Sequence, residues 1–220
     1  MLIPFDMLKV AQAAVVLLKA EPTRRMGRLR LLSLLYVADR ELVKERGRPI
    51  TGDTLIAMEY GPVLGRTLDL MTGTDVQSPA WQTFVKPDGA RDVAAGDDPG
   101  VGLLSRREIA KLQLLARRFE HDEDYQLTAY TRGFDEWIKN RPKTGASNKI
   151  PLDDFLEATG MLSKKSALLA IERAERAAEW AFGSQGRTGA SISPVPKRPK
   201  PGDVPVRRRK IIRLGKKKPA

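Results

Sequence analysis

The stretch LLYVADRELVKERGRPITGD, residues 34–53, joins the end of a strongly apolar helix to a glycine-rich turn. Apolar residues at helical spacing predict a helix from about residue 27 to residue 46. The predicted buried stripe of this helix consists of Leu31, Leu32, Leu35, Ala38, Leu42 and Val43. Gly47 and Pro49 end it, because a glycine just past the last turn followed by a proline is a common stop signal.

One acidic residue, Asp39, stands four residues after Leu35 and therefore on or beside this apolar stripe. A carboxylate in such a place must be paired or hydrogen-bonded, because an isolated buried charge is very costly. Two structural partners fit: the backbone N–H groups of the turn at residues 46–53, or the guanidinium of Arg66. The other interpretation is that Asp39 contacts a partner molecule.

Further helices surround one small β element in the predicted fold. Asp6 is an expected N-cap of a helix that ends at Ala20, residues 53–60 form a short strand, and Pro62 opens a helix that runs to about Met71. Alternating residues Trp81, Thr83 and Val85 before the turn sequence KPDGARDV predict a β-hairpin or ribbon within residues 81–104. More helices are expected at residues 105–121, 127–140, 152–158 and 163–182.

The charge is concentrated at the C-terminal end of the chain. Of 39 Lys+Arg and 27 Asp+Glu residues, twelve basic residues and one acidic residue lie in residues 183–220. This segment is rich in proline and lacks aromatic residues, so it cannot bury enough apolar surface to offset its ordering entropy. We therefore expect a mainly α protein, with a single helical domain at residues 1–182 and a disordered basic tail at residues 183–220. The candidate nucleic-acid contacts are Arg207, Arg208, Arg209, Lys210, Lys216, Lys217 and Lys218.

Catalytic and cofactor motifs are missing from the sequence. The absence of cysteine excludes thiol catalysis and cysteine-ligated metals, and with His121 the only histidine, a Ser-His pair has few ways to form. Glycine-rich phosphate loops are absent as well. We expect no enzymatic activity, no metal and no cofactor. Lys9 and Lys19 interrupt the N-terminal apolar run, so we expect a cytoplasmic protein without a membrane-spanning helix.

The order and spacing of several motifs resemble the Panacea domain, an antitoxin domain formerly grouped with phage-associated proteins. Residues 34–40 match its Leu-Leu-Tyr-x-Ala-Asp-Arg helix, residues 47–53 its Gly-x-Pro-Ile-Thr-Gly-Asp turn, and residues 60–63 its Tyr-Gly-Pro-Val motif. Farther along, LTAYTRGFDEW at residues 127–137 resembles a later family motif more weakly. It keeps the Thr and Trp of that motif but has Arg132 where the family usually has a histidine.

The resemblance implies a mainly helical protein that neutralises a cognate protein toxin encoded beside it, usually by direct contact. Delivery of the toxin to a protease is a second mode within the family, and catalysis is not implied. The candidates for toxin contact or for a structural role are Tyr36, Asp39, Arg40, Tyr60, Gly61, Pro62, Arg66 and Trp137. The rival interpretation is a nucleic-acid-binding regulator that combines the basic tail with a winged-helix-like core around residues 62–121.

Overall fold

The computed structural model of the chain describes residues 2–143 and 145–185. Contacts divide the chain into one compact unit up to Glu179 and a second unit that begins at Trp180. The core lies entirely in the first unit. Of the second unit, only the backbone of residues 180–185, the end of the last helix, is described.

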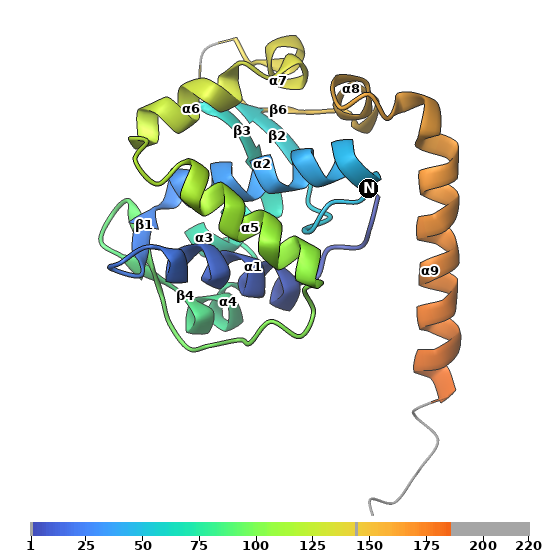
Figure 1. Cartoon of the computed structure of the whole chain (residues 1–220), viewed down its shortest axis with the longest axis horizontal. Helices are drawn as coiled ribbons and strands as arrows, with labels where there is room; N and C mark the ends of the chain where they lie inside the picture. Colours follow the sequence, from blue (N-terminus) through green and yellow to red (C-terminus); the bar gives the residue numbers. More distant parts are fainter. Residues whose placement is uncertain (1, 144, 186–220) are drawn as a thin grey trace, which may run out of the picture. The chain divides into compact units, whose positions relative to one another are not determined.

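The helix α2 (Arg28–Arg46) runs through the centre of the first unit (Figure 1). It packs against α1 (Met7–Ala20), α5 (Arg106–Arg118) and α6 (Asp124–Arg132), so every residue from Arg30 to Asp39 is buried rather than a single stripe. The predicted helix and its end are confirmed. Gly47 takes the left-handed conformation with φ 73°, and its N–H donates to the Val43 carbonyl at 2.7 Å.

Local capping signals set the starts of α1 and α5, and the cap at Asp6 is as predicted. The Asp6 carboxylate accepts hydrogen bonds from the N–H groups of Leu8 at 2.9 Å and Lys9 at 3.2 Å. Ser105 and Glu108 form a capping box that begins α5, although this helix ends at Arg118 and not near His121. Glu108 also accepts a 2.7 Å bond from Lys9 Nζ and thereby links the two helices.

One antiparallel sheet has the strand order β3–β2–β6, formed by β2 (Leu55–Met58), β3 (Gly61–Leu64) and β6 (Asn148–Lys149). The strand expected within residues 53–60 is confirmed, but the helix expected to begin at Pro62 is wrong. Pro62 lies in β3 opposite Ala57, and the next helix, α3 (Gly65–Thr72), begins three residues later. β3 is an edge strand, where a proline without an N–H group is tolerated.

A second antiparallel sheet has the order β1–β5–β4, formed by β1 (Arg25–Gly27), β4 (Val85–Asp88) and β5 (Asp92–Ala95). The hairpin across the KPDGARDV turn is confirmed. The alternation before it was misleading, because Trp81 and Thr83 lie in the helix α4 (Ser78–Phe84) and Trp81 is fully buried. β1 was not predicted, since three residues are too short to carry a periodic signal.

The C-terminal part of the described chain is helical. The segment expected at residues 127–140 is two helices, α6 and α7 (Asp135–Asn140), and α8 (Leu152–Ala158) is as predicted. A 3₁₀ turn (Leu162–Lys164) leads into α9 (Lys165–Gln185), which carries an ion pair between Glu172 and Arg176. α9 continues past the predicted tail boundary at Gly183. Residues 186–220, with all seven candidate nucleic-acid contacts, lie outside the described residues.

The mainly α fold class is confirmed, with two small sheets in the described chain instead of one hairpin. In Figure 1, α1, α2 and α5 lie side by side; the β2–β3 hairpin, α6 and α7 lie above them, α4 lies below, and α3 is seen behind α1 and α5. No helix among the described residues is long and apolar enough to cross a membrane.

Candidate functional site

Asp39 fastens the central helix to the turn that follows it. Its side chain is buried, with the residue 2% exposed, and its Oδ1 accepts the N–H groups of Ile50 at 2.7 Å and Thr51 at 3.1 Å. Its Oδ2 accepts the hydroxyl of Thr51. This is the first of the two arrangements that the sequence allowed. Arg66 is not the partner, because its Nε pairs with Asp75 Oδ2 at 2.9 Å.

A second buried carboxylate, Asp53, ends the same turn and was missed by sequence reasoning. Its Oδ1 accepts the N–H groups of Thr54 at 2.6 Å and Arg66 at 2.8 Å. Its Oδ2 accepts the N–H of Thr67 at 2.8 Å and the hydroxyl of Thr67 at 2.6 Å. Asp53 therefore binds the otherwise unpaired N–H groups in the first turn of α3, where a negative charge is also favoured by the helix dipole. The Gly-Asp pair at the end of the turn sequence could have indicated this role of Asp53.

The electrostatics of the two carboxylates are dominated by burial. Burial raises the pKa of Asp39 to about 7, against the lowering effect of its three hydrogen bonds, and the nearby Asp53 carboxylate raises it further. Burial also raises the pKa of Asp53, while bonds from Thr67 and from backbone N–H groups lower it. Both carboxylates are thus engaged in holding α2, the turn and α3 together.

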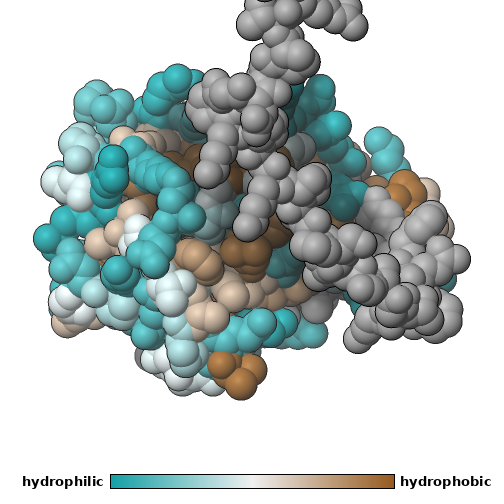
Figure 2. Space-filling model, turned by 90° about the horizontal axis from the view of Figure 1, so that it is seen from below, coloured by the Kyte–Doolittle hydropathy of each residue, from teal (hydrophilic) through white to brown (hydrophobic). Residues whose placement is uncertain are grey.

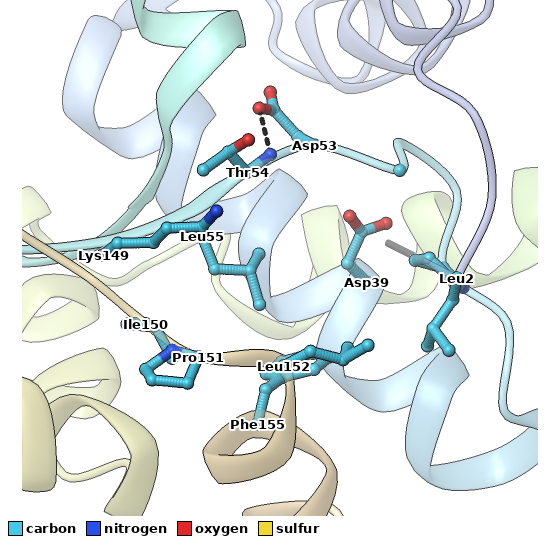
Figure 3. A pocket seen from close by; sticks show the side chains of 12 residues that line it. Leu2, Asp39, Asp53, Thr54, Leu55, Lys149, Ile150, Pro151, Leu152 and Phe155 are labelled. Carbon is cyan, nitrogen blue, oxygen red and sulfur yellow. Dashed lines mark hydrogen bonds between the residues drawn. The ribbon is translucent and has the colours of Figure 1, made fainter. Parts of the chain in front are cut away.

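A pocket of about 420 Å³ lies beside these carboxylates (Figure 3). Figure 3 shows Asp39 and Asp53 on one side of it and Ile150, Pro151 and Phe155 across from them. Most of the wall is apolar. The pocket can therefore accept an apolar group or water, and it offers polar atoms that are mostly bonded already.

Tyr36 and Arg40 project side by side toward the interior. The Tyr36 hydroxyl donates to Glu136 Oε1 at 3.2 Å, and Arg40 Nε donates to the same oxygen at 2.8 Å. Arg40 also stacks on the Phe134 ring at 4.1 Å and donates to the Ala158 carbonyl at 3.3 Å. Tyr36 is fully buried, so this cluster joins α2 to α7 and α8.

Glu136 is the centre of this cluster and was not among the predicted residues. Its side chain is fully buried, and its Oε2 has no hydrogen-bond partner among the residues that the structure describes. Burial and the Glu136 carboxylate raise the pKa of Tyr36 well above its usual value, so the hydroxyl stays protonated and donates. Nothing in the sequence around Glu136 distinguishes it from the exposed acids nearby.

Three further signature residues close the β2–β3 hairpin against the helices. Trp137 is buried and its Nε1 donates to the Met58 carbonyl at 2.9 Å. Gly61 has φ 128°, and a Cβ added there would lie 3.0 Å from the Thr131 hydroxyl, so glycine allows the strand to approach α6. Pro62 is buried beside it. These positions are structural in their contacts.

Two of the eight candidates reach the surface. Tyr60 lies at the tip of the β2–β3 hairpin and is 64% exposed. Arg66 is partly exposed, bonds Asp75, donates to Gln77 Oε1 at 2.9 Å, and stacks on the Phe5 ring at 4.5 Å. Figure 2 shows that apolar residues reach the surface in patches bordered by hydrophilic residues. Tyr60 is thus the signature residue best placed to contact another molecule.

His121 follows α5 in an exposed turn. Within residues 2–143 and 145–185, no cluster of His, Asp and Glu side chains could hold a metal ion. The buried acids of the described chain are bonded to backbone, hydroxyl and guanidinium groups. These bonds hold together the helices and turns that carry the signature residues.

Comparison with known proteins agrees with the signature. A search of curated proteins and a search of solved structures each found no match. The model of the family described as "Antitoxin SocA-like, Panacea domain" matches residues 31–138. This span begins in α2 and ends in α7, so it includes Asp39, Asp53, the β2–β3 hairpin and Glu136. Residues 31–138 of the chain therefore belong to the SocA-like Panacea domain family of antitoxins.

Proposed function

We propose that this protein is an antitoxin that neutralises a cognate protein toxin by binding it directly. The observation that carries the proposal is the family match over residues 31–138. The geometry is consistent with it, because the buried signature residues Asp39 and Tyr36 bond to other parts of the same chain. They build a rigid domain, and a partner would bind to the side chains on its surface.

The bonding of Asp39 and Asp53 also favours binding over catalysis. A general base needs a lone pair directed at a substrate proton. All four hydrogen bonds to Asp53 come from the chain itself, and Asp39 already accepts three. We place the protein in the cytoplasm, together with its toxin.

Co-expression with the toxin tests the proposal. We expect cells that carry both proteins to survive and the two chains to co-purify as a stable complex. If cells survive while the toxin stays abundant and no complex can be isolated, direct neutralisation is wrong. Toxin levels that fall only in protease-competent cells would instead support delivery to a protease.

One observation favours a second function. Twelve basic residues against one acidic residue in residues 183–220 fit an electrostatic contact with nucleic acid. This function would make the protein a regulator of transcription or translation instead of, or in addition to, an antitoxin. Deletion of the tail separates the two functions.

A further inference from the structure

A surface groove of about 840 Å³ lies where the start of α2, α3, α6 and the tips of both hairpins meet. We call it the Tyr60 groove; its lining includes Leu29, Tyr60, Leu68, Arg91, Tyr125 and Arg132. Its volume falls within the range typical of binding pockets, roughly 300–1,000 Å³. The groove belongs to the first compact unit and is separate from the pocket beside Asp39.

Large apolar side chains are unusually exposed along this groove. Leu29 is 47% exposed, Tyr60 64% and Tyr125 71%. Single exposed apolar residues are ordinary on protein surfaces, but a group of them in one concave site is typical of a binding site. Tyrosine is also enriched among the residues that dominate binding energy at protein interfaces.

The charges of the groove favour an acidic partner. Its two carboxylates already face arginines: Asp92 Oδ2 lies 3.0 Å from Arg25 Nη2, and Asp124 Oδ1 lies 3.6 Å from Arg30 Nη1. The guanidinium groups of Arg91 and Arg132 take part in no hydrogen bond or ion pair within the described chain. Arg132 lies over the Trp137 ring at 5.3 Å, and neither it nor Arg91 has an acidic partner among the residues described. Arginine can bind a partner's carboxylate with two parallel hydrogen bonds.

The walls of the groove are held in place before any partner binds. Arg30 of α2 donates to the Asp122 carbonyl at 2.6 Å and to the Phe119 carbonyl, which fixes the segment before α6. The Asp124 carboxylate of α6 lies next to Gly27 at the start of α2, since a Cβ added at Gly27 would lie 2.5 Å from Asp124 Oδ2. Preorganisation of this kind reduces the entropy lost on binding.

A protein segment fits the groove better than a nucleic acid does. Leu29 and Leu68 offer aliphatic surface, which suits apolar side chains of a partner. A nucleic acid would need cations along a run of phosphates, and the lining offers arginines at only three positions, Arg28, Arg91 and Arg132. Tyrosine and arginine alone would suit either class of partner.

We propose that the Tyr60 groove is the toxin-docking site, and that it binds a segment of the toxin in which apolar side chains stand next to carboxylates. This inference rests on the proposed antitoxin function. In this proposal the groove binds the toxin, and the buried signature residues stabilise the walls of the groove.

Two matched pairs of variants test the inference. Leu29→Ala removes an apolar side chain from the groove, and Leu114→Ala removes one of similar exposure, 51%, from α5 outside it. Arg132→Glu reverses a charge in the last turn of α6, and Arg117→Glu does the same in the last turn of α5, with an equal effect on the helix dipole. The full-length chain is titrated by calorimetry with the purified protein that its neighbouring gene encodes.

We expect Leu29→Ala and Arg132→Glu to weaken toxin binding by ten-fold or more each, about 1.4 kcal/mol, and the two controls to stay within about three-fold of wild type. Arg132→Glu should also reduce the salt dependence of binding, because the lost contact is electrostatic. Thermal melting checks that each variant is folded. If Arg132→Glu unfolds the protein through loss of its contact with Trp137, Arg91→Glu in the β4–β5 turn replaces it.

The results distinguish the antitoxin function from the assignment of the groove as its binding site. If wild type binds the toxin and the groove variants bind equally well, the groove is wrong and the antitoxin function stands. If the wild-type chain does not bind the toxin at all, both are wrong. If Arg132→Glu abolishes binding of a 12-nucleotide oligouridine and leaves toxin binding intact, the groove is a nucleic-acid site and the inference is refuted.

Discussion

Replacement of Asp39 tests whether one buried carboxylate holds the central helix to the signature turn. Asp39→Ala removes the acceptor for the N–H groups of Ile50 and Thr51 and for the Thr51 hydroxyl. Asp39→Asn keeps the shape of the side chain and an oxygen for the two N–H groups, and it removes the charge. The two variants therefore separate the hydrogen bonds from the ionisation.

The expected loss follows from the number of donors left without a partner. Each buried polar group that loses its partner costs about 1–3 kcal/mol. With three donors left unpaired, the loss in free energy of unfolding could therefore exceed that range. The neighbouring 420 Å³ pocket, which Asp39 lines, offers room for water beside the vacated position. We therefore expect Asp39→Ala to reduce the free energy of unfolding by about 3 kcal/mol.

The pH dependence has a definite sign. The pKa of Asp39 rises from 3.8 to about 7 on folding, so between these values the folded protein binds more protons than the unfolded chain. The contribution of Asp39 to the free energy of unfolding therefore falls as pH rises from about 4 to about 7, by at most about 1.4 kcal/mol per pH unit. Asp39→Asn lacks this titration. Relative to wild type, it should gain about 2–3 kcal/mol between pH 5 and pH 8.

Urea unfolding followed by tryptophan fluorescence at pH 5 and pH 8 measures both effects. The matched control is Asp97→Asn, which neutralises an exposed acid and should leave the pH dependence as in wild type. If wild type and Asp39→Asn show parallel pH profiles, the carboxylate is not desolvated as described. An unchanged stability of Asp39→Ala combined with lost toxin binding would move Asp39 from the scaffold to the interface.

Three further predictions concern other parts of the chain. Glu136→Ala should reduce the free energy of unfolding by about 3–5 kcal/mol, because it leaves the Arg40 guanidinium without its carboxylate. Chemical denaturation measures this loss, and a value below about 1 kcal/mol would contradict the prediction. Gly52→Ala should cost at least about 2 kcal/mol, since φ is 63° and the new Cβ would lie 2.6 Å from a backbone oxygen; an unchanged melting temperature would refute the close approach. Deletion of residues 186–220, which leaves α9 complete, should abolish salt-dependent nucleic-acid binding in a fluorescence-anisotropy assay and preserve toxin binding; a ten-fold loss of toxin affinity would make the tail part of the toxin-binding surface.

Much of the candidate site could be predicted where partners lie close in sequence. The hydrogen bond between Asp39 and Ile50 joins residues eleven positions apart. The glycines and the proline between them already indicate a turn in the sequence. In contrast, Tyr36 and Glu136 are 100 positions apart, and no local pattern in either segment pairs them. Arg40 therefore resembled an exposed interface residue until its carboxylate was found.

The sequence by itself determined the elements whose signals are local: α2 with its end at Gly47, the cap at Asp6, and the capping box that begins α5. These depend on side-chain periodicity and on hydrogen bonds within about one helical turn. Only the tertiary structure decided that Pro62 lies in a strand, because a Gly-Pro pair suits a helix start as well as an edge strand until a pairing partner is known. It also decided which surface is concave: the Tyr60 groove is assembled from segments distant in sequence, and packing alone brings their side chains together.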